Sequence, residues 1–327
     1  MRLLALTGLV VLLTTSGCSG PEPAPTPSPE PSPSATAEIV AITPSAKIDV
    51  GAGPVGVAAG NGAVWVVSAQ DESVSRIPSG ARRPDLVVDA PGVPLRVTVA
   101  YDAVWVTAFE AGRLLRLDPG TGRTVARVAT GAGPEGVTAG LGSVWVVAQD
   151  AGRLLRIDPA ADRVVDRVDI GAGARLVTTG LGAVWVSHFV DDEVLRVDPR
   201  SGDVARSGPV CHGPQGLLVA DGLVWVACTF SDQVVGLDPD TLEVVEDVAV
   251  PGYPDTVVAG PGGTLLVVAE QGPTLAVVDP ATGAVAEQVL DDLAPLGDRA
   301  NLDAAVLDGR VWVTSHSTDR VHRLSVR

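Results

Sequence analysis

Short apolar runs alternate with polar and glycine-rich turns along almost the whole chain after residue 45. In residues 134–173, an alternating segment ends at a glycine turn over residues 140–142, and the continuous apolar run Val144-Trp145-Val146-Val147 follows it. Two further short runs, at residues 154–157 and 164–168, complete this unit. Their lengths and the turns between them predict four antiparallel strands, and no segment has a convincing helical periodicity.

This four-strand unit recurs with a fixed period. Leu265 occupies the tryptophan position of the sixth unit, and Trp312 closes the series after a seven-residue insertion. A period of forty residues predicts a repeat architecture in which each unit packs against its neighbours. We therefore predict an all-β fold, a seven-bladed β-propeller of four-stranded blades over residues 46–327. The regularly spaced tryptophans of the first five units are Trp65, Trp105, Trp145, Trp185 and Trp225.

The two ends of the repeat region predict how the ring closes. The last unit ends with its third strand at residues 320–324, and the sequence stops at Arg327. Residues 46–50 align with residues 126–130, which hold a fourth-strand position. We expect the N-terminal strand to complete the last blade, because this pairing leaves no open sheet edge.

The first 45 residues predict export and a membrane anchor. Arg2 precedes an apolar run at residues 3–13, which is too short to span a bilayer and is typical of a signal peptide. The small residues before Cys18 resemble a bacterial lipobox, which implies cleavage after residue 17 and a lipid on Cys18. An ordinary signal peptide cleaved elsewhere is the alternative. Residues 18–45 are rich in Pro, Ser, Thr and Ala, as in an extended tether.

Charge narrows the range of partners. Residues 1–17 contain one charged side chain, Arg2, so their removal lowers the formal net charge from −16 to −17. Nucleic acids and anionic lipid surfaces are poor partners for such a protein. We expect a monomer on the extracytoplasmic side of the cell membrane, attached through the lipid on Cys18. Its partner is then an unidentified envelope protein, glycan or small molecule.

Two cysteines remain after Cys18. In an oxidising compartment, Cys211 and Cys228 are most simply a disulfide, which would add roughly 3 kcal/mol to stability. If residues 221–222 form a tight turn, Cys228 lies opposite Gln215, within a short loop of Cys211. The alternative is a metal site formed by Cys211, His212 and Cys228, for which no fourth ligand is evident. We therefore expect no metal and no cofactor.

Two recurrent motifs have structural explanations. Residues 51–56 and 131–136 both match the dinucleotide-binding pattern of spaced glycines, but a strand follows each match where that site needs a helix. Asp-Pro pairs such as Asp118-Pro119 favour type I turns over calcium sites. We likewise assign the regularly spaced tryptophans to packing between blades.

A ligand site is expected where the repeats differ. The loops before each first strand and after each second strand meet on one face, called the channel face below, around the central channel. The position after Pro54 and its equivalents is polar in four consecutive units, and mixed charges, histidines and aromatic rings suit a binding surface. The alternative is a set of solvated loop charges that pair with one another. The candidate ligand-binding residues are Glu135, Arg175, Gln215 and Asp255 (the polar arc), Arg96 and Asp303 at the next position, and His188, Phe189, Phe230, Glu270 and His316 after the second strands.

The repeat pattern G-x-G-P-x-G-V-x-x-G-x-G-x-V-W-V resembles that of the YVTN/YncE-like propeller proteins of bacterial envelopes over residues 46–327. This resemblance implies a secreted or envelope propeller without an enzymatic reaction. The related virginiamycin B lyase-like propellers are catalytic, and that family places histidines in the position after the proline, with glutamates and magnesium. In this sequence the position holds Val55, Leu95, Glu135, Arg175, Gln215, Asp255 and Leu302, with no histidine.

Two functions from different classes are therefore open. The favoured one is a non-enzymatic, lipid-anchored propeller that binds a ligand at the polar arc. The alternative is a metal-assisted lyase of the streptogramin lyase type, or a hydrolase, using His188, His316 and Glu270. We name no catalytic residue, because no nucleophile, base and orienting group come from neighbouring positions.

Overall fold

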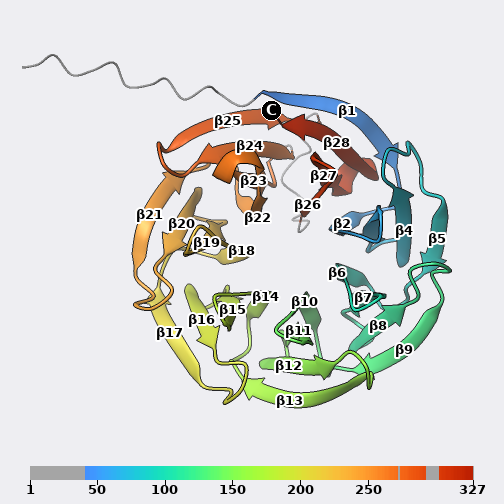
Figure 1. Cartoon of the computed structure of the whole chain (residues 1–327), viewed down its shortest axis with the longest axis horizontal. Helices are drawn as coiled ribbons and strands as arrows, with labels where there is room; N and C mark the ends of the chain where they lie inside the picture. Colours follow the sequence, from blue (N-terminus) through green and yellow to red (C-terminus); the bar gives the residue numbers. More distant parts are fainter. Residues whose placement is uncertain (1–40, 272, 292–301, 327) are drawn as a thin grey trace, which may run out of the picture. The chain divides into compact units, whose positions relative to one another are not determined.

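Seven four-stranded antiparallel sheets surround a central axis in the computed structural model (Figure 1). The structure describes residues 41–271, 273–291 and 302–326. The predicted seven-bladed β-propeller is confirmed. Within those ranges no helix has the length and apolar character needed to cross a membrane.

Six blades are each built from four consecutive strands, running from the channel outward. They are β2 to β5 (Pro54–Gly60, Ala63–Ser68, Ser73–Pro78, Leu86–Asp89), β6 to β9 (Pro94–Ala100, Ala103–Ala108, Arg113–Leu117, Thr124–Ala129), β10 to β13 (Pro134–Gly140, Ser143–Ala148, Arg153–Asp158, Arg163–Asp169), β14 to β17 (Ala174–Gly180, Ala183–His188, Glu193–Val197, Val204–Pro209), β18 to β21 (Pro214–Ala220, Leu223–Cys228, Gln233–Leu237, Val244–Ala249) and β22 to β25 (Pro254–Ala259, Leu265–Ala269, Thr274–Asp279, Ala284–Val289). Two 3-10 turns, η1 (Pro261–Gly263) and η2 (His316–Thr318), interrupt the strand pattern.

The seventh blade combines the two ends of the repeat region. Its strand order is β1 (Ile42–Asp49), β28 (Arg320–Val326), β27 (Arg310–Ser315) and β26 (Ala304–Leu307), with β26 at the channel. The predicted closure by the N-terminal strand is confirmed. β1 starts at Ile42, within the range assigned to the tether, and its register shifts between Pro44 and Ala46. The proline is tolerated there because β1 is an outer edge strand.

Each tryptophan side chain is buried, and the guanidinium group of an arginine lies over the ring of most of them. Trp145 is 2% exposed, and its indole Nε1 donates to the carbonyl of Gly140 at 3.1 Å. The guanidinium of Arg156 lies 5.7 Å from the Trp145 ring centroid and donates to the carbonyl of Pro199 in the next blade at 3.1 Å. The packing role predicted for the tryptophans is confirmed, and the arginine ties neighbouring blades together. The equivalent pairs are Arg76 with Trp65, Arg116 with Trp105, Arg196 with Trp185 and Arg323 with Trp312.

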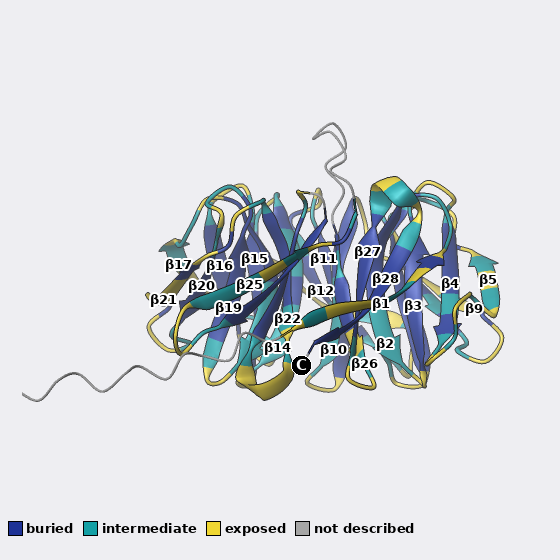
Figure 2. Cartoon of the chain, turned by 90° about the horizontal axis from the view of Figure 1, so that it is seen from above, coloured by how far each residue is buried: buried dark blue, intermediate teal, exposed yellow. Residues whose placement is uncertain are grey.

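The Asp-Pro pairs form turns, as predicted. A carboxylate oxygen of Asp118 accepts hydrogen bonds from the backbone N–H groups of Gly120 at 3.1 Å and Thr121 at 2.7 Å. The side-chain and backbone hydrogen bonds from Thr121 lower the pKa of Asp118. Second strands such as β3 and β15 are buried throughout, inner strands such as β14 are partly buried, and outer strands such as β5 and β21 are more exposed (Figure 2).

Candidate functional site

A local irregularity at the start of the inner strands positions the candidate residues. In β10 the pairing with β11 shifts between Pro134 and Val137, and similar shifts occur in β6, β14, β18 and β22. In a regular strand successive side chains point to opposite faces of the sheet. Such a bulge interrupts this alternation and changes the direction in which the nearby side chains point. The first residue after the proline is turned away from the channel cavity, and the second lines it.

The polar arc occupies the first of these positions and is more buried than the sequence indicates. Glu135 is 3% exposed, Gln215 is 1% exposed and Asp255 is fully buried. A guanidinium nitrogen of the partly buried Arg175 donates to the side-chain oxygen of Gln215 at 3.3 Å. Gln215 also lies beside Asp255 and lowers its pKa, although no hydrogen bond of normal geometry reaches either Asp255 oxygen from the described residues. Three arc residues from consecutive blades thus form one row.

Arg96 and Asp303 occupy the second position and meet within the channel. A terminal nitrogen of Arg96 lies 3.7 Å from a carboxylate oxygen of Asp303. Arg96 lies in β6 and Asp303 directly precedes β26, and both strands contact β2, which lies between them. In β2 the equivalent residue is Gly56, where a Cβ atom would lie 2.5 Å from the carbonyl oxygen of Leu95. The absent side chain therefore lets the neighbouring strand approach closely and lets Arg96 reach across.

Threonine hydroxyls hold the backbone at both charged residues. The backbone N–H of Arg96 donates to Thr107 at 3.0 Å, and the Thr107 hydroxyl donates to the carbonyl of Glu135 in the next blade at 2.9 Å. Asp303 repeats this arrangement with Thr314, at 2.8 Å. The same kind of bridge thus anchors each charge to its second strand and to the adjacent blade.

Arg96 and Asp303 line a cavity of about 320 Å³ in the channel, called the channel cavity. Burial raises the pKa of Asp255 to about 8, with Glu270 and Asp303 adding to the effect and Arg96 opposing it. Burial also raises the pKa of Asp303, against the positive charge of Arg96 and hydrogen bonds from the backbone of Val57 and Ala304. The cavity lining contains Arg96, Thr98, Thr138, Thr256 and Asp303 among mostly apolar residues.

An aromatic cluster lies beside the arc on the channel face. The Arg175 guanidinium stacks over the Phe189 ring at 3.9 Å from its centroid. Phe189 and Phe230 make an edge-on contact with centroids 5.4 Å apart, and His212 lies 5.3 Å from Phe230. Arginine and aromatic rings in this arrangement are typical of binding surfaces.

The predicted disulfide between Cys211 and Cys228 is confirmed, with a Cα–Cα distance of 5.9 Å. Both sulfurs are bonded to each other, so they do not form the alternative metal site. Cys228 pairs with Pro214 and not with Gln215, because the bulge between Pro214 and Leu217 shifts the register.

The two candidate histidines have separate surroundings. His188 is buried, and its Nδ1 lies 3.4 Å from Asp191. His316 lies 3.4 Å from the side-chain nitrogen of Gln70, in a different blade. Glu270 is placed near Asp255, through the effect on its pKa. Within the described part of the chain, no three His, Cys, Asp or Glu side chains are grouped to hold a metal ion.

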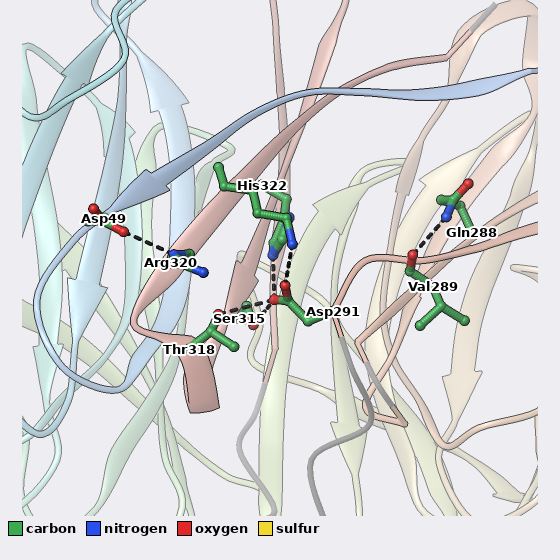
Figure 3. Close-up of polar contacts among 9 residues, drawn as sticks. Asp49, Gln288, Val289, Asp291, Ser315, Thr318, Arg320 and His322 are labelled. Atoms are coloured by element: carbon green, nitrogen blue, oxygen red, sulfur yellow. Dashed lines mark hydrogen bonds and ion pairs between the residues drawn. The ribbon is translucent and has the colours of Figure 1, made fainter.

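A buried polar cluster at the ring closure, centred on Asp291, was not predicted from the sequence (Figure 3). Asp291 accepts hydrogen bonds from His322 at 2.6 Å, Ser315 at 2.7 Å, Lys47 at 2.8 Å and Thr318 at 3.1 Å. Burial alone would raise the pKa of Asp291, but the hydrogen bonds from Lys47, Ser315 and His322 lower it to about 2. Burial lowers the pKa of His322. The one available signal was Lys47, the single lysine of the chain.

Fold and site together define a seven-bladed β-propeller with a buried, charged channel. Similar solved structures are a streptogramin B lyase, at 16% identity over 88% of this chain and 97% of that chain with a TM-score of 0.73, and the selenomethionine-substituted virginiamycin B lyase from Staphylococcus aureus, at 16% identity over 88% and 100% with a TM-score of 0.74. A catalytically inactive virginiamycin B lyase from the same organism, solved with quinupristin, has 18% identity over 88% and 100% with a TM-score of 0.72. At these identities the likeness shows the fold alone. No family model and no curated protein matches the chain.

Proposed function

We propose that this protein is an extracytoplasmic lipoprotein whose propeller binds a ligand at the channel face without catalysing a reaction. The observation that carries the proposal is the row formed by Arg175, Gln215 and Asp255 across three neighbouring blades. Burying such groups costs free energy, so the fold gains nothing from them that an apolar residue would not supply. The equivalent positions Val55 and Leu302 are apolar and equally buried.

The aromatic cluster supports a binding role at the same place. Arg175 contacts both the arc, through Gln215, and the aromatic cluster, through Phe189. A guanidinium held flat on a ring keeps its remaining donors in a fixed orientation, which favours recognition of carbonyl, carboxylate or hydroxyl oxygens. An envelope protein, a glycan or a small molecule can present such oxygens.

Attachment to the membrane is part of the proposal and rests on residues 1–40, which lie outside the described residues. A lipid on Cys18, followed by the Pro-rich tether, would hold the propeller at the extracytoplasmic surface of the membrane. Growth with an alkyne-tagged fatty acid should label the wild-type protein and not Cys18→Ser. Equal labelling of both proteins would contradict the anchor.

Binding is favoured over a lyase reaction by the residues at the position after the proline. The names of the similar structures describe lyases, whereas this chain has no histidine at that position in any unit. A general base must lie within hydrogen-bond reach of the proton it removes. His188 and His316 lie in different blades and share none of the contacts described above.

Thermal unfolding of the purified protein tests the proposal. Envelope glycans, small metabolites and divalent metals are added singly, since a ligand that binds only the native state raises the midpoint. We expect a shift in the wild type and in the exposed control Arg167→Ala, and none in Arg175→Ala. A metal-dependent shift abolished by His188→Ala or His316→Ala, or turnover of the compound, would favour the lyase.

A further inference from the structure

We propose that the channel cavity binds the carboxylate of a small, partly apolar molecule through the guanidinium of Arg96. The inference rests on the proposed function and names the ligand chemistry of the channel. It depends on Arg96, Asp303 and the cavity walls, and not on the aromatic cluster.

Arg96 is a buried cation whose donors are unused. Its side chain is 6% exposed and lines the cavity. Among the described residues, none accepts a hydrogen bond from its Nε or from either terminal nitrogen. A guanidinium carries five N–H donors, and removing it from water without partners costs several kcal/mol. The channel therefore holds a set of donors that a planar anion would satisfy.

Asp303 does not fill this role. Its distance of 3.7 Å from Arg96 is too long for a hydrogen bond. One of its oxygens accepts the backbone N–H of Val57 at 3.1 Å, and the other accepts that of Ala304 at 2.9 Å. Asp303 is thus fixed by the backbone, where it holds Arg96 electrostatically but leaves the guanidinium donors free for a ligand.

The neighbouring acid, Asp255, leaves the positive charge of Arg96 available to an anion. Asp255 faces Arg96, Glu270, Asp303 and Gln215, and burial raises its pKa to about 8. Near neutral pH this carboxyl group is protonated, so it does not cancel the charge of Arg96. A carboxylate matches the planar fork of a guanidinium, because its two oxygens can accept two parallel N–H bonds.

The size and lining of the cavity limit the size and polarity of the ligand beyond its carboxylate group. A volume of about 320 Å³ lies at the lower end of the range for ligand pockets, which favours a small molecule. Leu176, Leu217 and Val257 are among the lining residues, but polar atoms form more of the exposed wall than apolar atoms do. A small carboxylate with a limited apolar part, such as a single ring, matches this size and this mixed lining.

Isothermal titration of the purified full chain with benzoate, and with benzamide as its uncharged match, tests the inference. We expect benzoate to bind at about pH 6, at least about tenfold more tightly than benzamide, because a charged hydrogen-bonded pair contributes more than a neutral one. Arg96→Met, which keeps the bulk and removes the donors, should weaken benzoate binding at least about tenfold. The exposed control Arg167→Met should bind as the wild type does.

A second measurement keeps the test valid if Arg96→Met fails to fold. In wild-type protein labelled with nitrogen-15, benzoate should shift one arginine Nε–H resonance and benzamide should leave it in place. No benzoate binding, or equal binding of the two compounds, overturns the inference. If a panel ligand still binds in a way that requires Arg175, the proposed function stands while this inference fails. If neither ligand binds, both fail.

Discussion

Arg96 and Asp303 lie 3.7 Å apart although a whole blade separates their strands around the ring. The pair exists because the second position after the proline holds a glycine in alternate blades, at Gly56, Gly136 and Gly216. Seven positions cannot alternate completely, so two side chains come together once, at Thr256 and Asp303, which are 3.5 Å apart. The side chains at this position are therefore not arranged with sevenfold regularity around the channel.

Gly56→Ala should disturb this arrangement. The new Cβ would lie 2.5 Å from the carbonyl oxygen of Leu95 and 3.0 Å from the Cα of Arg96, so the strands must separate. We expect a loss of roughly 1–3 kcal/mol in the free energy of unfolding, measured with denaturant. Gly120→Ala is the control, since its Cβ meets no atom closer than 3.4 Å. Equal effects of the two changes would contradict the close approach.

Asp255 predicts a dependence of stability on pH. Its folded pKa of about 8 lies above the unfolded value of about 3.9, so the folded state binds more protons between these values. Stability from this group is present at low pH and is lost as pH rises through 8. Asp255→Asn should remove this decline, whose slope is at most about 1.4 kcal/mol per pH unit.

Thermal midpoints between about pH 5 and pH 9 measure this effect. The wild type should lose stability relative to Asp255→Asn as pH rises, and the exposed control Asp247→Asn should follow the wild type. Parallel curves for the wild type and Asp255→Asn would show that Asp255 is ionised at neutral pH, contrary to its burial.

Asp291 should stabilise the ring closure. It links the end of β25 to β1, β27 and β28, so Asp291→Asn should lower the free energy of unfolding by about 3–5 kcal/mol, the range for one partner of a buried pair. Chemical denaturation near neutral pH measures the loss, and Asp247→Asn is again the control. A loss no larger than that of the control would mean that the closure does not depend on the cluster.

Acid should weaken the same closure in two stages. His322 has a lowered pKa, so its stabilising neutral state is lost as pH falls below the unfolded value of about 6.5. Asp291 has a lowered pKa of about 2, so its contribution is present above about pH 4 and is lost as pH falls toward 2. Denaturant midpoints against pH should fall less steeply below pH 4 in Asp291→Asn. Identical slopes for the wild type and Asp291→Asn would contradict the lowered pKa of Asp291.

Reduction of the disulfide should be costly. The bond between Cys211 and Cys228 closes a segment with a sequence separation of 17, and its loss should lower stability by roughly 3 kcal/mol. The free energy of unfolding of the wild type and of the double variant Cys211→Ser/Cys228→Ser, each measured with and without reductant, gives the contribution of the disulfide. Reductant should have no effect on the variant, and an equal effect on both proteins would show that the bond is not its target.

The fold was predictable because its physical causes repeat. The forty-residue spacing of tryptophans such as Trp145, with the glycine turns between strands, indicates the strands, the blade and the number of blades. The same spacing placed Arg175 next to Gln215, which the structure joins at 3.3 Å. The disulfide was predicted from an exported pair of cysteines, and the hairpin register that placed Cys228 opposite Gln215 was wrong by one residue, because the bulge leaves no periodic signal.

The rest of the site depends on contacts that no repeat encodes. Burial of Glu135 and Asp255 accompanies the bulge, which turns the first residue after the proline away from the channel cavity. The meeting of Arg96 with Asp303 needs an absent side chain at Gly56 in the blade between them. The Asp291 cluster belongs to the closure, where Lys47 of β1 meets Ser315 and His322 of the last blade, so the forty-residue period does not predict it.

The most direct test of a binding site on the channel face is isothermal titration of a ligand identified by the thermal screen. We predict saturable binding to the wild type and to Arg167→Ala, with no turnover, and at least about tenfold weaker binding to Arg175→Ala, since the lost group donates charged hydrogen bonds. Equal affinities for all three proteins, or conversion of the compound into product, would contradict a non-enzymatic site built on Arg175.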